Sequence, residues 1–322
     1  MTAMPTTSPP RARGRALRRA AAPAFALTAL VLPAVLSGCA AFGDDRSGVV
    51  VTTNILGDLT RAVVGDEAEV TVLMPPNADP HSFGVSARQA ARMEQAELLV
   101  YNGLGLEEGV LRNVEAAEEA GASGLEVGEA VDPIEYTEGE TAGRPDPHFW
   151  TDPVRAAEAV DAIADAVVAQ VDGADEDRVR ANAERYRGQV EELHEEAAER
   201  FAALPGERRR LVTNHHVFGY LAQRYDFEVV GAVVPSGSTL ASPSSSDLKS
   251  LADAVRDADV PAVFADSSRP DRLARVMADE AGLEIEVVPL FSESLTAEDG
   301  EAPTYLEMTR HNTGAIADAL AR

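Results

Sequence analysis

The chain has 322 residues, a length typical of about two domains, and its 28 Lys and Arg residues against 54 Asp and Glu residues give a formal net charge of −26. That balance argues against nucleic acid binding, which needs a basic surface, while a hydrophobic content of 45% suffices for a substantial core and argues against wholesale disorder. A single cysteine excludes an intramolecular disulfide and any Cys-based zinc finger.

The N-terminus has the features of an export signal. Five arginines between Arg11 and Arg19 precede an apolar run at 20–36, and small residues follow it, as in a secretory signal peptide. Pro23 and Pro33 interrupt the run, which disfavours a permanent transmembrane helix. We therefore expect 1–38 to be a signal peptide.

The end of this region, Leu36-Ser37-Gly38-Cys39, resembles the lipobox of bacterial lipoproteins. The resemblance implies that Cys39 becomes the first mature residue and carries a diacylglyceryl group on its sulfur. Residues 39–48 would then be a tether, and the protein would be anchored at the extracytoplasmic face of the cell membrane. Without 1–38 the chain keeps 23 basic and 54 acidic residues, a net charge of −31. Such a charge favours cations in general and identifies no ligand.

Short apolar runs alternate with amphipathic segments from Val49 onward. Strands are expected at 49–55, 70–74 and 98–101, and helices at 59–64, 86–95 and 106–120. Ser86 and Gln89 have the spacing of a capping box at the start of the second helix. This alternation predicts a parallel sheet with helices on both faces.

Two long helices follow in the middle of the chain. Residues 153–171 have apolar side chains at helical spacing, and 177–204 have one apolar stripe among Glu and Arg residues. The second helix ends at Pro205-Gly206 and would be about 40 Å long. We predict that it is a rigid helix that links an N-terminal lobe at 49–176 to a C-terminal lobe at 205–322.

The C-terminal part repeats the strand–helix alternation. Strands are expected at 211–213, 229–234, 262–265 and 285–290, and helices near 216–225, 245–258, 270–281 and 303–321. The predicted fold is therefore α/β, with two βα lobes that each contain a parallel sheet. Ligands of such sheets bind beyond the carboxyl ends of the strands.

Three of the six histidines lie at those strand ends or in loops. His81 and His148 each end an Asp-Pro-His triplet, and His215 follows the strand at 211–213. Three imidazoles and a carboxylate form a tetrahedral set that suits zinc. His194 and His311 lie within predicted surface helices, where we expect solvated side chains.

Four motifs together resemble one known family, the metal-binding lipoproteins of bacterial zinc and manganese ABC importers. They are Asp79-Pro80-His81-Ser82-Phe83, Asp146 to Pro153, His215 to Tyr220, and Thr304 to Met308 before Asn312. The resemblance covers about 49–321 and implies one metal ion in the cleft between the two lobes. It also implies the ligands His81, His148 and His215, with a fourth from 289–295.

The fourth ligand is the residue on which this sequence departs from the family. Members usually have aspartate where this chain has Glu293, so direct, bidentate and water-bridged contacts are all open. Asp266, after the strand at 262–265, is the competing carboxylate. Asp79 or Asp146 would be placed to orient a ligand histidine.

His215 is the residue that favours zinc over manganese. Manganese-type members resemble this pattern but have a carboxylate at that position, and a third imidazole favours Zn²⁺ over the harder Mn²⁺. The predicted function is therefore capture of zinc as transported cargo and its delivery to an ABC importer permease, without catalysis. A metallochaperone is a further candidate partner. The acidic stretch 135–146 is either a metal-capture loop or an ordinary solvated loop.

Two other classes compete with this interpretation. A zinc hydrolase also uses three histidines and an open water position. However, position 198 is alanine, so the His194-Glu195 pair lacks the second histidine of a metalloprotease helix, and Ser236-Gly237-Ser238 is no nucleophile elbow. A manganese-binding or adhesin-type relative is the other alternative.

Overall fold

The computed structural model describes residues 48–137, 141–234, 236–268, 271–280, 282 and 285–322. The predicted signal peptide, Cys39 and nearly all of the predicted tether lie outside these residues, as do Glu138 and Glu140 of the acidic stretch. Among the described residues, no helix combines the length and the apolar character needed to cross a bilayer.

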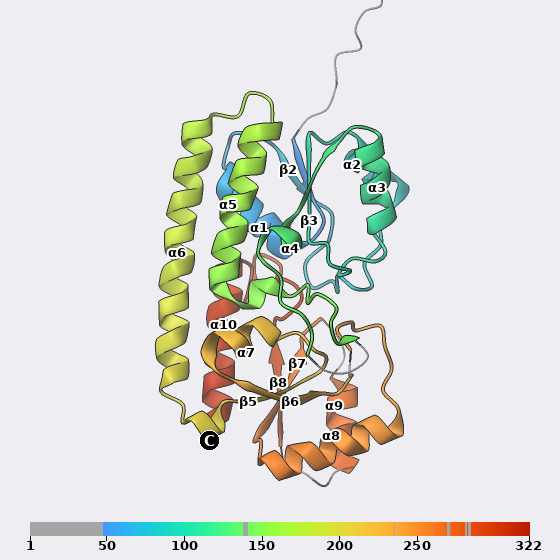
Figure 1. Cartoon of the computed structure of the whole chain (residues 1–322), viewed down its shortest axis with the longest axis vertical. Coiled ribbons are helices and arrows are strands. Elements are labelled where there is room, and N and C mark those ends of the chain that lie inside the picture. Colours follow the sequence, from blue (N-terminus) through green and yellow to red (C-terminus); the bar gives the residue numbers. More distant parts are fainter. Residues whose placement is uncertain (1–47, 138–140, 235, 269–270, 281, 283–284) are drawn as a thin grey trace, which may run out of the picture. The chain divides into compact units, whose positions relative to one another are not determined.

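The N lobe is built on a four-stranded parallel sheet (Figure 1). Its strands are β1 (Val49–Val51), β2 (Val70–Val72), β3 (Leu98–Tyr101) and β4 (Ser123–Glu126), in the order β2-β1-β3-β4. Its helices are α1 (Asn54–Val64), α2 (Ala87–Glu94), α3 (Leu111–Glu119) and the short α4 (Val127–Ala130). Val51 packs in the core with α1, whereas Val50 packs on the α2 and α3 side, so alternate residues bury opposite faces.

Three predictions for this lobe need correction. Helix α1 begins at Asn54 instead of 59, because the Thr53 side chain caps it by accepting from the Leu56 amide. Helix α3 begins at Leu111 instead of 106. Strand β4 and α4 were not predicted, because the sequence Ser-Gly-Leu-Glu has no apolar run. The capping box of α2 at Ser86 and Gln89 is confirmed.

The C lobe repeats the same strand order in a second parallel sheet. Its strands are β5 (Arg210–Thr213), β6 (Glu228–Ala232), β7 (Ala262–Asp266) and β8 (Glu286–Leu290), in the order β6-β5-β7-β8. Its helices are α7 (Gly219–Tyr225), α8 (Ser245–Ala258), α9 (Arg272–Glu280) and α10 (Tyr305–Leu320). The predicted fold of two parallel-sheet lobes is confirmed. The strand predicted at 49–55 ends at Val51, because α1 begins at Asn54, and the other strand limits shift by one or two residues.

Helices α5 (Pro153–Gln170) and α6 (Glu176–Ala202) pack against each other, and α6 contributes to both lobes (Figure 1). Its Val179 and Tyr186 belong to the N-lobe core, and its Phe201 belongs to the C-lobe core. Helix α10 does the same, with Tyr305 in the first core and Leu320 in the second. The predicted long helix is therefore present, and α10 is a second connection that the sequence did not indicate. Short 3₁₀ turns lie at Phe149–Thr151 and Gly206–Arg208.

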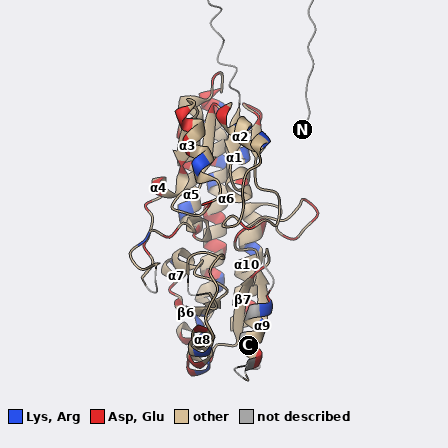
Figure 2. Ribbon diagram, turned by 90° about the vertical axis from the view of Figure 1, so that its right-hand side faces the viewer, with Lys and Arg blue, Asp and Glu red and all other residues tan. Residues whose placement is uncertain are grey.

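Charged residues lie mainly on helices and loops (Figure 2). The strands of the first sheet contain one charged residue, Glu126. Exposed ion pairs such as Arg180–Asp165, at 2.9 Å, join α6 to α5. Pairs of this kind contribute about 0–1 kcal/mol each, so the apolar stripe of α6 accounts for most of this contact.

One ion pair between the lobes is different, because its carboxylate is buried. Asp152 caps α5 by accepting from the Val154 amide, and the guanidinium of Arg224 on α7 contacts both of its oxygens. The Nη2 atom of Arg224 lies 2.8 Å from Oδ2, and the Asp152 side chain is 4% exposed. The pair therefore ties the first turn of α5 to the C lobe.

Replacing Arg224 by alanine leaves a buried carboxylate without its partner. We expect the metal-free Arg224→Ala protein to lose about 3 kcal/mol of unfolding free energy in urea titrations. Arg210→Ala is the matched control, because its partner Glu228 is 63% exposed, and it should lose at most about 1 kcal/mol. Equal losses in the two variants would contradict the role of Asp152 as a buried anchor.

Candidate metal centre

Four buried side chains from both lobes converge at one point. One donor atom from each lies within 4.8 Å of every other, and the four residues are His81, His148, His215 and Glu293. These are the four residues predicted from the sequence.

Each of the four residues lies in a loop beyond a strand's carboxyl end. In the N lobe, His81 follows β2, and His148 lies beyond β4, in the connection from α4 to α5. In the C lobe, His215 follows β5 and Glu293 follows β8. The cluster thus forms where loops from the two sheets meet, at the place where α/β sheets bind ligands.

The spacing of the donor atoms suits a small tetrahedral ion. Nε2 of His81 and Nε2 of His148 are 3.4 Å apart. Oε1 of Glu293 lies 3.0 Å from Nε2 of His215 and 3.5 Å from Nε2 of His148. Zinc bonds of 2.0–2.1 Å in a tetrahedron place neighbouring donors about 3.3 Å apart. Nε2 of His81 and Oε2 of Glu293 are further apart, at 3.8 Å, so the four residues come close to the spacing around one small divalent ion.

Glu293 is buried without hydrogen-bond donors. The residue is 1% exposed, and neither of its carboxylate oxygens accepts a hydrogen bond from the described residues. Burial raises the pKa of Glu293 well above its usual value, and the negative charges of Asp266, Asp79 and Asp146 raise it further. A buried carboxylate in this state is stabilised by a bound cation.

The imidazole of His148 is held in the form that binds metals. Burial, followed by the charges of His215 and His216, lowers its pKa well below the usual value, so the ring is neutral at neutral pH. Oδ1 of Asp146 lies 2.7 Å from Nδ1 of His148. When Nδ1 donates to this carboxylate, the lone pair of Nε2 faces the cluster. Burial raises the pKa of Asp146 to about 7.

The two Asp-Pro-His triplets adopt the same local turn. Oδ1 of Asp79 accepts from the His81 amide at 2.9 Å, and Oδ1 of Asp146 accepts from the His148 amide at 2.9 Å. Each aspartate thus fixes the backbone of the histidine two residues later. Asp146 also contacts the ring of its histidine, with Oδ1 2.7 Å from Nδ1 of His148.

The competing carboxylate, Asp266, is not one of the four converging side chains. Its Oδ2 accepts hydrogen bonds from the backbone and hydroxyl of Ser292 and from the backbone of Glu293. It therefore contacts the segment that carries Glu293.

The N lobe also holds the Glu293 segment. The side chain of Asn54 donates to Ser294 Oγ at 2.7 Å and accepts from the Leu295 amide at 2.9 Å. The indole of Trp150 donates to the Ser292 carbonyl at 2.9 Å. Glu293 thus belongs to the C lobe by chain order but is fixed by both lobes. No local sequence pattern indicated Asn54.

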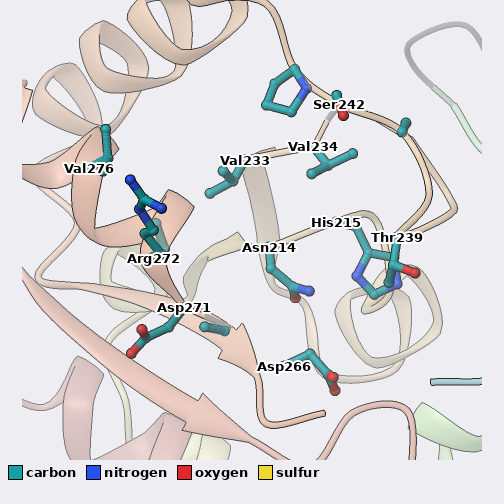
Figure 3. A pocket seen from close by; sticks show the side chains of 14 residues that line it. Asn214, His215, Val233, Val234, Thr239, Ser242, Asp266, Asp271, Arg272 and Val276 are labelled. Atoms are coloured by element: carbon teal, nitrogen blue, oxygen red, sulfur yellow. The ribbon is translucent and has the colours of Figure 1, made fainter. Parts of the chain in front are cut away.

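One cavity includes a residue of the cluster, and a second includes residues that contact His148. A cavity of about 560 Å³ includes His215 and Thr239 at one end and Asp271 and Arg272 at the other (Figure 3). A second cavity of about 440 Å³ is lined by Tyr136, Asp146 and His216, among others. The hydroxyl of Tyr136 lies 3.3 Å from Nδ1 of His148, a contact that the sequence did not indicate.

His194 and His311, the two histidines predicted on surface helices, lie away from the cluster. Nδ1 of His194 is 3.1 Å from the Tyr225 hydroxyl, and the ring of His311 packs 4.8 Å from that of Phe291. Both are half-buried, so the expectation of freely solvated side chains is wrong in detail.

Comparisons with known proteins agree with this geometry. A family model described as "Zinc-uptake complex component A periplasmic" matches residues 49–319. The manganese-binding lipoprotein MntA of Halalkalibacterium halodurans is 27% identical over 307 residues, which cover 92% of this chain and 98% of MntA. The iron-binding protein YfeA of Yersinia pestis is 28% identical over 269 residues, covering 84% and 85% of the two chains.

A solved structure has the same fold. The periplasmic zinc-binding protein TroA from Treponema pallidum superposes with a TM-score of 0.79 at 27% identity, covering 86% of this chain and all of TroA. The family match extends over both sheets and all four converging residues. The chain therefore belongs to the zinc-uptake complex component A family, the metal-binding solute-binding proteins of ABC transporters, and is not an enzyme.

Proposed function

We propose that this protein captures Zn²⁺ outside the cytoplasm with His81, His148, His215 and Glu293 and delivers it to the permease of an ABC importer. The observation that carries the proposal is the buried cluster itself, in which three imidazoles and one carboxylate are spaced for a single ion. The carboxylate accepts no hydrogen bond from the described residues, and this supports a cation as its partner.

The donor set supports zinc rather than manganese or iron. The relatives named above bind manganese or iron according to their names, whereas the family model and TroA refer to zinc. Three nitrogen donors and one oxygen donor match borderline Zn²⁺, while Mn²⁺ prefers oxygen ligands and more of them. Manganese remains the competing cargo, because the name of a relative that covers nearly the whole chain refers to it.

The position of the site supports release by movement of the lobes. Two proposed ligands belong to each lobe by chain order, so a movement of the lobes that breaks the contacts of Asn54 and Trp150 with the Glu293 segment would separate the donor pairs. A lipid anchor at Cys39 would keep the loaded protein close to its permease and raise the effective concentration there.

The first prediction concerns metal stoichiometry and choice. Titration of the metal-free protein should give one tight Zn²⁺ site per chain, with Mn²⁺ bound more weakly. His215→Ala should weaken zinc binding by at least about a hundredfold, because it removes one of four ligands. His194→Ala is the control and should bind as the unmodified protein does. Tighter binding of Mn²⁺ than of Zn²⁺ would reject the proposed cargo.

The second prediction uses Glu293→Gln, which removes the buried charge but keeps the shape. The pKa of Glu293 is higher in the folded protein than in the unfolded chain. The free energy of unfolding is therefore highest below the ordinary pKa of glutamate, and it falls as the pH rises above that value, because the folded protein must then ionise a buried carboxyl group. The metal-free variant should therefore be more stable than the unmodified protein at pH 8 and equal to it near pH 4.

With zinc present at pH 8, the unmodified protein should be the more stable of the two. It has the Glu293 carboxylate and so binds zinc more tightly, and tighter binding stabilises the folded state more. Thermal unfolding with and without Zn²⁺ measures both effects. The same zinc-induced rise in Tm for both proteins would show that Glu293 does not bind the ion.

The third prediction concerns Cys39. In a bacterial host, the unmodified protein should incorporate labelled palmitate and sediment with membranes. Cys39→Ser should lose the label, while purified protein keeps its zinc affinity. A variant that keeps the palmitate label would contradict lipid anchoring at this residue.

A further inference from the structure

We infer that Asp266 is a positioning residue that fixes Glu293 for metal binding from outside the ligand set. The inference rests on the proposed function of the cluster as a metal site. Asp266 is a buried carboxylate beside the cluster that is not one of the four proposed ligands.

The hydrogen bonds of Asp266 are divided between two segments. Oδ2 accepts from the Ser292 amide at 3.2 Å, the Ser292 hydroxyl at 2.6 Å and the Glu293 amide at 3.1 Å. Oδ1 accepts from the amide and the hydroxyl of Ser268. The residue is 3% exposed, so these contacts replace water completely. A carboxylate with this many donors has a fixed orientation.

The place of Asp266 in the sheet explains why it is suited to this role. It is the last residue of β7 and pairs in register with Leu290, the last residue of β8. Beyond Leu290 the chain leaves the sheet, and the amides of residues 292 and 293 have no strand partner. Asp266 accepts from both amides, so the backbone at Glu293 is hydrogen-bonded to the end of β7 although it lies outside the sheet.

Fixing the backbone matters because the glutamate side chain is long. Its carboxylate accepts no hydrogen bond from the described residues, so no such contact restrains the side chain from the far end. Ordering a free glutamate upon metal binding would cost conformational entropy, which a fixed backbone reduces before the ion arrives.

The same arrangement occurs at two other proposed ligands. The amides of His81 and His148 are each held by a buried aspartate, Asp79 or Asp146, within the same loop. Three of the four ligand segments therefore have a buried carboxylate on the ligand's own amide. Asp266 differs because it lies 27 residues before Glu293 and acts across the sheet.

The charges of these aspartates also suit a dication. One ionised glutamate and three neutral imidazoles leave a bound Zn²⁺ with one uncompensated positive charge. Asp79, Asp146 and Asp266 are buried and each accepts the amide of a proposed ligand, so they place further negative charge near the ion without being among the four converging side chains.

The test is a double-mutant cycle on zinc affinity, measured by chelator competition with the metal-free mature chain. Asp266→Asn should weaken zinc binding by about 10- to 100-fold, the usual effect of removing a residue that supports a ligand. In a Glu293→Gln background the same substitution should have no further effect, because Asp266 acts through Glu293. A purely structural role would give the same loss in both backgrounds.

Two further variants keep the test independent of folding defects. Ser292→Ala removes one of the three donors and should cause a smaller loss that also disappears with Glu293→Gln. Ser268→Ala removes a donor to the other oxygen, away from Glu293, and should change affinity by less than about twofold. Circular dichroism and the Tm of each metal-free variant check the fold.

The outcomes separate this inference from the proposed function. Unchanged affinity in Asp266→Asn, or an undiminished loss in the Glu293→Gln background, overturns the positioning role and leaves the four-ligand site intact. Unchanged affinity in Glu293→Gln and His215→Ala overturns the proposed site, and the inference with it.

Discussion

A carboxylate buried among three imidazoles, to which the part of the chain that the structure describes donates no hydrogen bond, is the constraint on which the rest of this structure depends. Burial disfavours the ionised form of Glu293 and raises its pKa well above its usual value, although Nε2 of His215 lies 3.0 Å from Oε1. A divalent cation at the centre of the cluster favours the ionised form of Glu293 instead. Affinity and instability therefore have the same origin: the features that disfavour an ionised Glu293 in the free protein are those that favour a bound zinc ion.

Such a site needs a scaffold that holds its four loops together. The two sheets have the same strand order and present their loops at the carboxyl edges, while α6 and α10 contribute apolar residues to both cores. The buried pair Asp152–Arg224 and the contacts of Asn54 with the Glu293 segment add polar connections between the lobes. Apolar packing thus supplies the stability, and a few directional contacts determine where the donors stand.

Much of this organisation could be predicted from the sequence, because it depends on local patterns. Apolar β-branched runs gave seven of the eight strands, and β4 was missed because its pairing with β3 compensates for a poor strand sequence. Helix α3 starts later than predicted because the carboxylate of Glu107 accepts from the amides of Asn102 and Gly103, which keeps this segment in turns. His81 and His148 were recognisable by their Asp-Pro-His turns, and His215 by its position at the end of a strand. The role of Asp266 was not, because it depends on the β7–β8 register and on contacts between residues 26 and 27 positions apart.

The most direct test of the account is the structure of the zinc-loaded protein, with anomalous scattering measured on both sides of the zinc absorption edge. The account predicts one ion between the lobes, bound by Nε2 of His81, His148 and His215 and by an oxygen of Glu293, at about 2.0–2.2 Å. It also predicts Asp266 on the Ser292 and Glu293 amides, without contact to the metal. An ion ligated by Asp266 in place of Glu293, or one located outside the histidine cluster, would contradict it.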